Sequence, residues 1–298
     1  MSSLQRYLAE EIASDHLDGL LTRREAFRRL ALLGLGTAAA ATLITACGQH
    51  RKPGTSQPPG AATSSPPPGL ATALRTAPIT WPGPQGQLQG AWAEPPTARG
   101  GVLVLHENKG LNDWVRSVAG RFAGAGYSAL AVDLLSEDGG SGHFADPAQA
   151  AAALARTAPQ RFTADMKSAV AELQRRVPGR KVAAVGFCFG GGLVWQLLGS
   201  AEPQLSAAIP FYGPLQDEPD FSGSTAAVLA IYAALDTRIT ASQSAAKAAL
   251  DRAGLVIEIV VEPNADHAFF NDTGPRYNAA AANDAWRRVL DWLARYLA

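Results

Sequence analysis

Between residue 76 and the C-terminus, short apolar runs alternate repeatedly with segments of helical length and periodicity, which is the strongest constraint on the fold. Most of the runs are unbroken, as expected of strands buried on both faces of a parallel sheet. The alternation predicts a single-domain, doubly wound, mostly parallel α/β fold with right-handed crossovers. The expected strands are 79–81 and 88–93 (a hairpin), 101–105, 128–132, 181–186, 207–211, 228–233 and 256–261. The expected helices are 112–125, 147–157, 161–176, 191–198, 242–253 and 277–297.

Composition excludes several classes of function. Lys+Arg and Asp+Glu both number 26, and a balanced chain lacks the basic field that nucleic-acid binding requires. The two cysteines cannot build a Cys-rich zinc site, and the five histidines show no H-x-H or H-E-x-x-H spacing. A phosphate-binding G-x-x-x-x-G-K-[ST] loop is also missing from the sequence. We therefore expect no nucleic-acid partner, no metal and no bound nucleotide.

Residues 1–47 resemble a bacterial export signal. The basic pair Arg23-Arg24, similar to a twin-arginine signal, precedes an apolar stretch of sixteen residues, 30–45, which is short for a membrane span of about 20. The run Ile44-Thr45-Ala46-Cys47 resembles a lipobox, in which the cysteine is lipidated and becomes the new N-terminus. The alternatives are an amphipathic helix packed on the domain, or cleavage nearby with Cys47 discarded. The twin-arginine and general export routes both stay open.

Residues 48–75 are rich in Pro, Ser and Gly and predict a spacer, so the first seventy residues are expected to lie outside the fold. The catalytic body would then span 76–298, the length of one domain. An exported chain of this organisation would be periplasmic or extracytoplasmic. Its only membrane contact would be the lipid on Cys47. A lipidated cysteine of this kind carries more than one acyl chain, as stable attachment requires.

The run Gly186-Phe187-Cys188-Phe189-Gly190 follows an expected strand and precedes an expected helix. It matches the G-x-nucleophile-x-G elbow, with cysteine in place of serine. The elbow needs glycines because the backbone is strained and side chains beside the nucleophile would collide with it. The N-terminus of the following helix favours a thiolate and a developing oxyanion. The alternatives for Cys188 are a buried inert thiol, and for the glycines a phosphate-binding loop.

A cysteine nucleophile requires a base and a group that orients the base. Asp236 follows the apolar run 228–235, and His267 follows the expected strand 256–261. The carboxyl ends of parallel strands meet at one edge of the sheet, where such folds bind ligands. We therefore expect Cys188, Asp236 and His267 to form a catalytic triad, with Asp266 as a weaker candidate for the acid. The alternatives are a helix N-cap for Asp236 and a surface-loop histidine for His267.

With these residues in place, the body resembles the dienelactone hydrolase (carboxymethylenebutenolidase) family from about residue 79 to the C-terminus. The resemblance implies an α/β-hydrolase fold. Several spaced motifs in the same order carry it: His106-Glu107-Asn108, Gly110-Leu111-Asn112, Gly124-Ala125-Gly126-Tyr127, Asp133-Leu134, Gly186–Gly192, Phe211-Tyr212-Gly213, Asp236 and His267-x-Phe269.

The resemblance implies further site residues. Glu107 would help to generate the thiolate when substrate binds, with capping of the next helix as its alternative role. The backbone N–H groups of Asn108 and Phe189 would form the oxyanion hole. The candidates for the substrate pocket are Tyr212, Phe269 and Asn271. His106, at the end of a strand, is expected to be packed rather than catalytic.

Members of the family that act on dienelactone hold the substrate carboxylate with two arginines. The corresponding positions here are Glu137 and Asn271, which cannot form the guanidinium–carboxylate pair. Arg238, Arg276 and Lys109 are possible substitutes. The sequence therefore predicts the hydrolase chemistry without predicting dienelactone as the substrate.

The expected function is hydrolysis of a small-molecule ester or lactone by the Cys188 thiolate, without a cofactor. A cysteine peptidase or thioesterase on the same fold is the alternative within the enzymes. A non-catalytic, exported ligand-binding lipoprotein is the alternative outside them.

Overall fold

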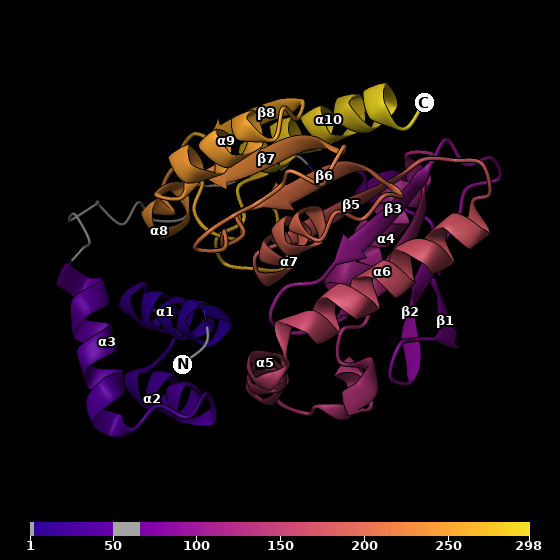
Figure 1. The fold of residues 1–298 in the computed structure, drawn as a ribbon. Coiled ribbons are helices and arrows are strands. Elements are labelled where there is room, and N and C mark those ends of the chain that lie inside the picture. The colour runs from indigo at the N-terminus through magenta and orange to yellow at the C-terminus, as the bar shows by residue number, and fades with distance from the viewer. Residues whose placement is uncertain (1–2, 50–65) are drawn as a thin grey trace.

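The computed structural model describes residues 3–49 and 66–298, and its centre is a twisted eight-stranded sheet with helices on both faces (Figure 1). The spatial order of the strands is β1-β2-β4-β3-β5-β6-β7-β8. The strands are β1 (Ala77–Pro82), β2 (Gln87–Ala93), β3 (Gly101–Leu105), β4 (Ser128–Val132), β5 (Val182–Phe187), β6 (Leu205–Phe211), β7 (Ala227–Ala233) and β8 (Ile257–Glu262).

The pairing of the strands confirms the predicted α/β class. β1 and β2 form the expected hairpin, β2 pairs antiparallel with β4, and all the remaining neighbours are parallel. Every residue of β3, β4, β5 and β7 is buried, because helices cover both faces of these strands. Among the described strands, β8 has a neighbour on one side only, and it is half-exposed along most of its length.

Each predicted helix is present, with boundaries that differ by at most two residues. Asn112 and Asn278 cap two of these helices by accepting hydrogen bonds from the N–H groups of Val115 and Ala281. The helices of the body are α4 (Asp113–Gly124), α5 (Pro147–Arg156), α6 (Pro159–Arg176), α7 (Phe189–Gly199), α8 (Thr237–Thr240), α9 (Gln243–Arg252) and α10 (Ala279–Tyr296), with 3-10 turns η1 (Leu70–Thr72), η2 (Ser136–Asp138) and η3 (Ser141–His143). The short α8 and the 3-10 turns had no counterpart among the predicted elements.

The sheet register brings the predicted site loops to one edge. Leu105 of β3 pairs with Gly186 of β5, so the loop that follows β3 adjoins the elbow. Phe187 pairs with Phe211, and Ala233 of β7 pairs with Glu262 of β8. The loops after β3, β5, β6, β7 and β8 therefore lie side by side at the carboxyl edge of the sheet.

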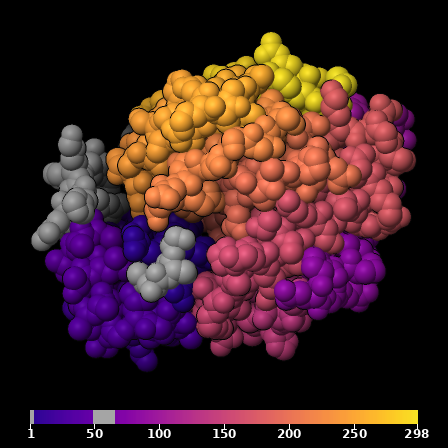
Figure 2. All heavy atoms as spheres, in the orientation of Figure 1, coloured from indigo at the N-terminus to yellow at the C-terminus, as the bar shows by residue number. Residues whose placement is uncertain are grey.

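The N-terminal residues pack on the body, whereas the first seventy residues were expected to lie outside the fold. They form α1 (Ser3–Leu17), α2 (Arg23–Leu32) and α3 (Thr37–Gln49), which pack on one another and, through α1 and α2, on α5. The spheres in Figure 2 show these helices (indigo) against the C-terminal half (orange) and the middle (pink) of the chain. The physical reason is burial, because α1 and α2 together remove several apolar side chains from solvent.

The body also begins before the expected residue 76. The turn η1 lies against α4, and Leu74 N–H donates a 2.9 Å hydrogen bond to the carbonyl of Gly120. Part of the expected spacer, 50–65, lies outside the described residues. Removal of residues 1–47 as an export signal stays a prediction.

Among the described residues, no single helix combines the length and hydropathy needed to cross a membrane. One pair of helices, Arg23–Leu32 and Thr37–Gly48, satisfies both criteria together, with a bend of 119° between its members.

Candidate active site

Cys188 occupies a sharp turn between β5 and α7. Its backbone has φ 57° and ψ −118°, a conformation that L-residues rarely adopt. A Cβ atom on Gly186 would lie 2.1 Å from the carbonyl oxygen of Gly190, and one on Gly190 would lie 2.3 Å from that of Leu105. The two glycines of the predicted elbow are therefore required by close backbone approach.

The turn presents backbone donors beside the Cys188 thiol. Phe189 is the first residue of α7, and the N–H groups of a helix's first turn have no acceptor within the helix. Asn108 lies in the loop after β3, which the strand register places next to the elbow. This arrangement is compatible with the predicted oxyanion hole of the Phe189 and Asn108 amides.

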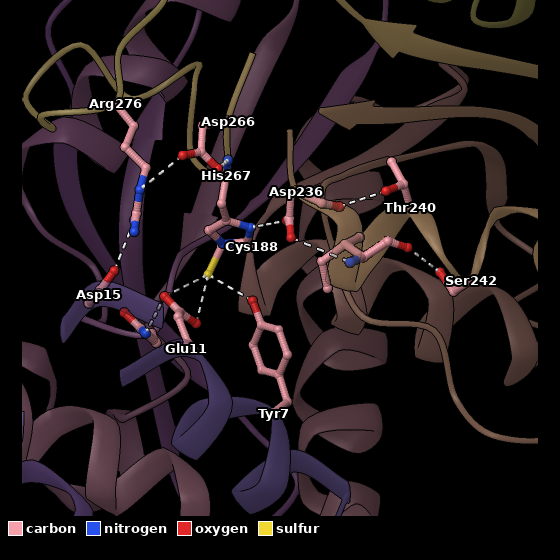
Figure 3. A network of polar contacts seen from close by, with 12 residues as sticks. Tyr7, Glu11, Asp15, Cys188, Asp236, Thr240, Ser242, Asp266, His267 and Arg276 are labelled. Atoms are coloured by element: carbon pink, nitrogen blue, oxygen red, sulfur yellow. Dashed lines mark hydrogen bonds and ion pairs between the residues drawn. The ribbon is translucent and has the colours of Figure 1, made fainter. Parts of the chain in front are cut away.

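His267 and Asp236 meet at the same edge of the sheet (Figure 3). His267 Nδ1 lies 2.6 Å from Asp236 Oδ2, and both side chains are buried. His267 Nε2 is buried and has no hydrogen-bond partner among the described residues. A ring nitrogen of His267 also lies within 4.8 Å of Cys188 Sγ.

The charges of these groups affect one another. Burial alone would lower the pKa of His267, but the charge of Asp236 and its hydrogen bond to the ring outweigh burial and hold that pKa well above its usual value. A thiolate at Cys188 would act in the same direction. Burial raises the pKa of the Cys188 thiol to about 11, and the nearby Glu11 carboxylate acts in the same direction. The imidazolium of His267 opposes that shift. In this arrangement of the chain, the thiol form of Cys188 is therefore favoured.

Asp266, the weaker candidate for the acid, makes different contacts. Its Oδ1 accepts a 2.7 Å hydrogen bond from the backbone N–H of His267, and its carboxylate lies 3.6 Å from Arg276. The ring of His267 is held by Asp236. Adjacent residues on an extended or turning chain rarely direct their side chains at one another, which explains the difference.

Glu107 is buried beside the predicted triad and is held by Asn271. The Asn271 amide donates a 2.8 Å hydrogen bond to Glu107 Oε2, and Glu107 Oε1 has no hydrogen-bond partner among the described residues. Burial raises the pKa of Glu107, whereas Lys109 and Asn271 lower it. The structure brings Glu107 close enough to Cys188 for its charge to affect the thiol pKa, but gives no direct hydrogen bond between them.

The other predicted residues around Cys188 and His267 are packed in the interior. Tyr212 and Phe269 are both fully buried, and their rings lie 5.4 Å apart at their centroids. The Tyr212 ring also contacts His267 edge-on, at 5.2 Å. His106 Nδ1 lies 2.7 Å from the Glu107 carbonyl, and its Nε2 accepts from Leu134 N–H, so both ring nitrogens are engaged. His106 is packed, as the sequence predicted.

Two residues near Cys188 were not predicted, and both come from α1. Tyr7 Oη lies 3.1 Å from Cys188 Sγ, and both carboxylate oxygens of Glu11 lie 3.5 Å from the same sulfur. Glu11, Cys188 and His267 each place one donor atom within 4.8 Å of the others, and these donor types suit a zinc ion. No sequence pattern links a residue of α1 to an elbow 177 positions away.

Two of the candidate substitutes, Arg276 and Arg238, lie at the site, and so does Asn271, whereas Glu137 does not. Arg276 and Arg238 both contact α1, as described below, whereas Glu137 lies 3.3 Å from Arg161. Glu137 also lines a separate cavity of about 450 Å³, formed with residues of the β1–β2 hairpin and η2. Glu137 and Asn271 therefore do not form a pair across one pocket.

Comparison with known proteins agrees with this geometry. A family profile described as the dienelactone hydrolase family matches residues 88–297. A protein of Escherichia coli O157:H7, provisionally named carboxymethylenebutenolidase, is 34% identical over 209 residues, covering 65% of this chain and 76% of its own. One of Saccharolobus solfataricus with the same provisional name is 30% identical over 242 residues, covering 68% of this chain and 92% of its own.

Solved structures show the same fold. The crystal structure of a provisionally named dienelactone hydrolase of Klebsiella pneumoniae superposes with a TM-score of 0.64 at 29% identity, covering 75% of this chain and 100% of that chain. The sheet, the elbow and the loops after β7 and β8 thus define an α/β-hydrolase fold. Within that class, the chain belongs to the dienelactone hydrolase family, because the profile matches more than half of its length.

Proposed function

We propose that this chain hydrolyses small-molecule esters or lactones with Cys188 as the nucleophile. The observation that carries the proposal is the strained turn at Cys188, which lies beside the ring of His267. Asp236 holds that ring through its Nδ1 atom. Such strain is found where a functional side chain must be held in one place. Membership of a hydrolase family supports the same reaction class.

The proposed reaction proceeds through two steps. The Cys188 thiolate attacks the ester carbonyl, and the amides of Asn108 and Phe189 bind the oxyanion of the tetrahedral intermediate. The intermediate collapses to a thioester as the C–O bond breaks, and His267 donates its proton to the leaving alkoxide. His267 then accepts a proton from a water molecule, which attacks the thioester as the C–S bond breaks. This step releases a carboxylic acid and the Cys188 thiolate, which recovers its proton from Glu107.

Glu107 is proposed to accept the Cys188 proton when substrate enters. Its buried, unpartnered Oε1 has the capacity to accept a proton, and its raised pKa makes it a stronger base than an exposed glutamate. Dienelactone itself is not proposed as the substrate, because Glu137 is paired with Arg161 and Asn271 with Glu107.

The test is a panel of aryl esters, lactones and thioesters assayed with the wild type and with Cys188→Ala. Because α1 contacts Cys188, a site-specific protease sequence is placed within residues 55–60 of both proteins. Each protein is assayed before cleavage, and again after cleavage and removal of the N-terminal fragment. The wild-type protein with this inserted sequence is called the cleavable chain. We expect hydrolysis after cleavage that Cys188→Ala reduces by several orders of magnitude, the usual consequence of losing a nucleophile. Equal rates in the two proteins would refute the role of Cys188.

We also propose that the chain is exported and lipidated at Cys47. The basic pair Arg23-Arg24, the short apolar stretch and Ile44-Thr45-Ala46-Cys47 support this proposal. The test is fractionation of cells that express the full chain or its Cys47→Ser variant, with mass spectrometry of the N-terminus. We expect the wild type in the membrane fraction, beginning at an acylated Cys47. Finding both proteins in the cytosol with residue 1 attached would refute the proposal.

A further inference from the structure

Helix α1 lies directly over the catalytic cysteine. Tyr7 and Glu11 are one helical turn apart, so their side chains project from the same face of the helix. Both reach Cys188 Sγ, at 3.1 Å for the Tyr7 hydroxyl and 3.5 Å for the Glu11 carboxylate (Figure 3). The same face continues to Asp15 and to Asp18, the residue directly after α1, and both are directed at the body of the enzyme.

The body presents complementary groups to this acidic face. Arg276, which is largely buried, pairs with Asp15 at 2.9 Å and also with Asp18. The Asn108 amide donates a 2.9 Å hydrogen bond to Glu11 Oε1. The Arg238 guanidinium lies over the ring of Tyr7, 4.7 Å from its centroid. Three residues of α1, and Asp18 directly after it, therefore meet groups that surround the active site, and charge complementarity fixes the helix in one register.

Apolar packing holds the helix in place. Tyr7, Leu8 and Ala9 of α1 are almost fully buried, and so are Leu30 of α2 and Leu33 that follows it. Complete burial of a leucine side chain contributes about 1.5–3 kcal/mol. The ion pair of Arg28 with Asp146, at 2.7 Å, joins α2 to the residue that caps α5, but exposed pairs add little.

The occupied positions are those that a substrate needs. A carbonyl carbon must approach the nucleophile to about 3–3.5 Å before it reacts. The Tyr7 hydroxyl and the Glu11 carboxylate already lie at such distances from Cys188 Sγ. The negative charge of Glu11 also disfavours the thiolate, because like charges repel at short range.

We propose that the surface around the active site is a docking site for the acidic face of α1, and that α1 is an intramolecular inhibitor which keeps the full-length chain latent. The docking of α1 is inferred from its contacts with the body. Its effect, inhibition of hydrolysis, rests on the proposed function. Removal of the segment up to Cys47, the expected site of processing, would separate α1 from the body and free Cys188. The enzyme would then become active only where its N-terminal segment is removed.

The first experiment uses the full chain in a Cys47→Ser background, in which Cys188 is the only cysteine. Asp15→Lys combined with Asp18→Lys reverses the charges that face Arg276. Arg6→Glu, at an exposed position of the same helix, is the matched control. Two rates are measured: alkylation of Cys188 by iodoacetamide, followed by intact mass, and hydrolysis of the best ester in the panel.

We expect the double variant to increase both rates and the control to leave them unchanged. If the undocked state is a minor population of about 0.1–10%, its release raises the rates by about 10- to 1000-fold. A second variant, Tyr7→Ala with Glu11→Ala, removes the groups that touch the sulfur and should act in the same direction.

The second experiment adds a synthetic peptide of residues 1–22 to the cleavable chain after cleavage and removal of the N-terminal fragment. We expect the peptide to slow alkylation of Cys188 and hydrolysis in parallel. A peptide with Asp15→Lys and Asp18→Lys should be weaker, whereas one with Arg6→Glu should match the wild type.

The two proposals fail in different ways. Rapid alkylation of Cys188 in the full chain, unchanged by both α1 variants and by cleavage, would overturn the inhibitory role even where esters are hydrolysed. Slow alkylation that accelerates on undocking, without hydrolysis of any substrate in the panel, would support docking of α1 and contradict the hydrolase proposal instead.

Discussion

Asp236 Oδ2 lies 2.6 Å from the ring Nδ1 of His267, while Asp266, the chain neighbour of that histidine, binds only its backbone N–H. Two aspartates thus contact one histidine at different atoms. Only the ring contact fixes the tautomer and orientation that leave Nε2 available for proton transfer. This difference gives a matched pair of variants.

Asp236→Asn should reduce kcat/KM of the cleaved chain by about 10²–10⁴-fold, because the amide cannot stabilise the imidazolium. The pKa of His267 should fall in this variant, since the Asp236 charge is the main cause that raises it. Asp266→Asn should retain activity close to that of the wild type. Steady-state kinetics of both variants check the assignment, and equal losses would contradict it.

Glu107→Gln should reduce kcat/KM of the cleaved chain by about 10²–10⁴-fold, the usual contribution of a general base. The raised pKa of Glu107 means that the carboxylate is the major form only above that pKa. The wild type should therefore lose activity as the pH falls through this value, and the variant should lack that limb of the profile. A variant with unchanged kinetics would leave His267 as the only base for the thiol.

Gly190→Ala should destabilise the fold and abolish hydrolysis, because the new Cβ would lie 2.3 Å from the carbonyl oxygen of Leu105. Overpacking of this kind typically costs about 1–3 kcal/mol. Gly142→Ala is the control, since nothing lies within 4 Å of the corresponding Cβ position. Chemical denaturation measures both, and a wild-type midpoint for Gly190→Ala would show that the elbow tolerates a side chain.

Asp165→Asn should stabilise the protein at pH 8 by about 1–2 kcal/mol, after the loss of the 3.7 Å pair with Arg161 is allowed for. Burial, and then Glu137, raises the pKa of Asp165 to about 6, and neither carboxylate oxygen has a hydrogen-bond partner among the described residues. The charged form is thus disfavoured in the fold.

The sign of the pH dependence follows from that shift. Below the unfolded pKa, near 3.9, the carboxyl is neutral in both states and costs nothing. The penalty grows as the pH rises to about 6 and is then constant, so the gain from Asp165→Asn should disappear at pH 4. Thermal unfolding at both values tests this, with the exposed Asp291→Asn as control. A gain of equal size at pH 4 would exclude ionisation as its cause.

Much of the body could be predicted from sequence because its signals are local. Unbroken apolar runs identified the strands, and the glycines beside Cys188 identified the turn that the backbone geometry requires. Asp236 and His267 were also found by position, since each follows a strand and parallel strands end at one edge. The short helix α8, which begins after Asp236, was missed because four residues carry no periodic signal.

The sequence by itself determined the order of strands and helices, the elbow and the residue types available for catalysis, because these depend on neighbours along the chain. Only the tertiary structure decided that Asn271 binds Glu107, and that Tyr7 and Glu11 of a segment resembling an export signal lie against Cys188. Positions 7, 11, 15 and 18 share one helical face, but that face has no partner until the sheet brings Arg276, Asn108 and Arg238 together around the thiol. Contacts between residues far apart in the chain depend on the packing of the whole molecule, and no local pattern encodes them.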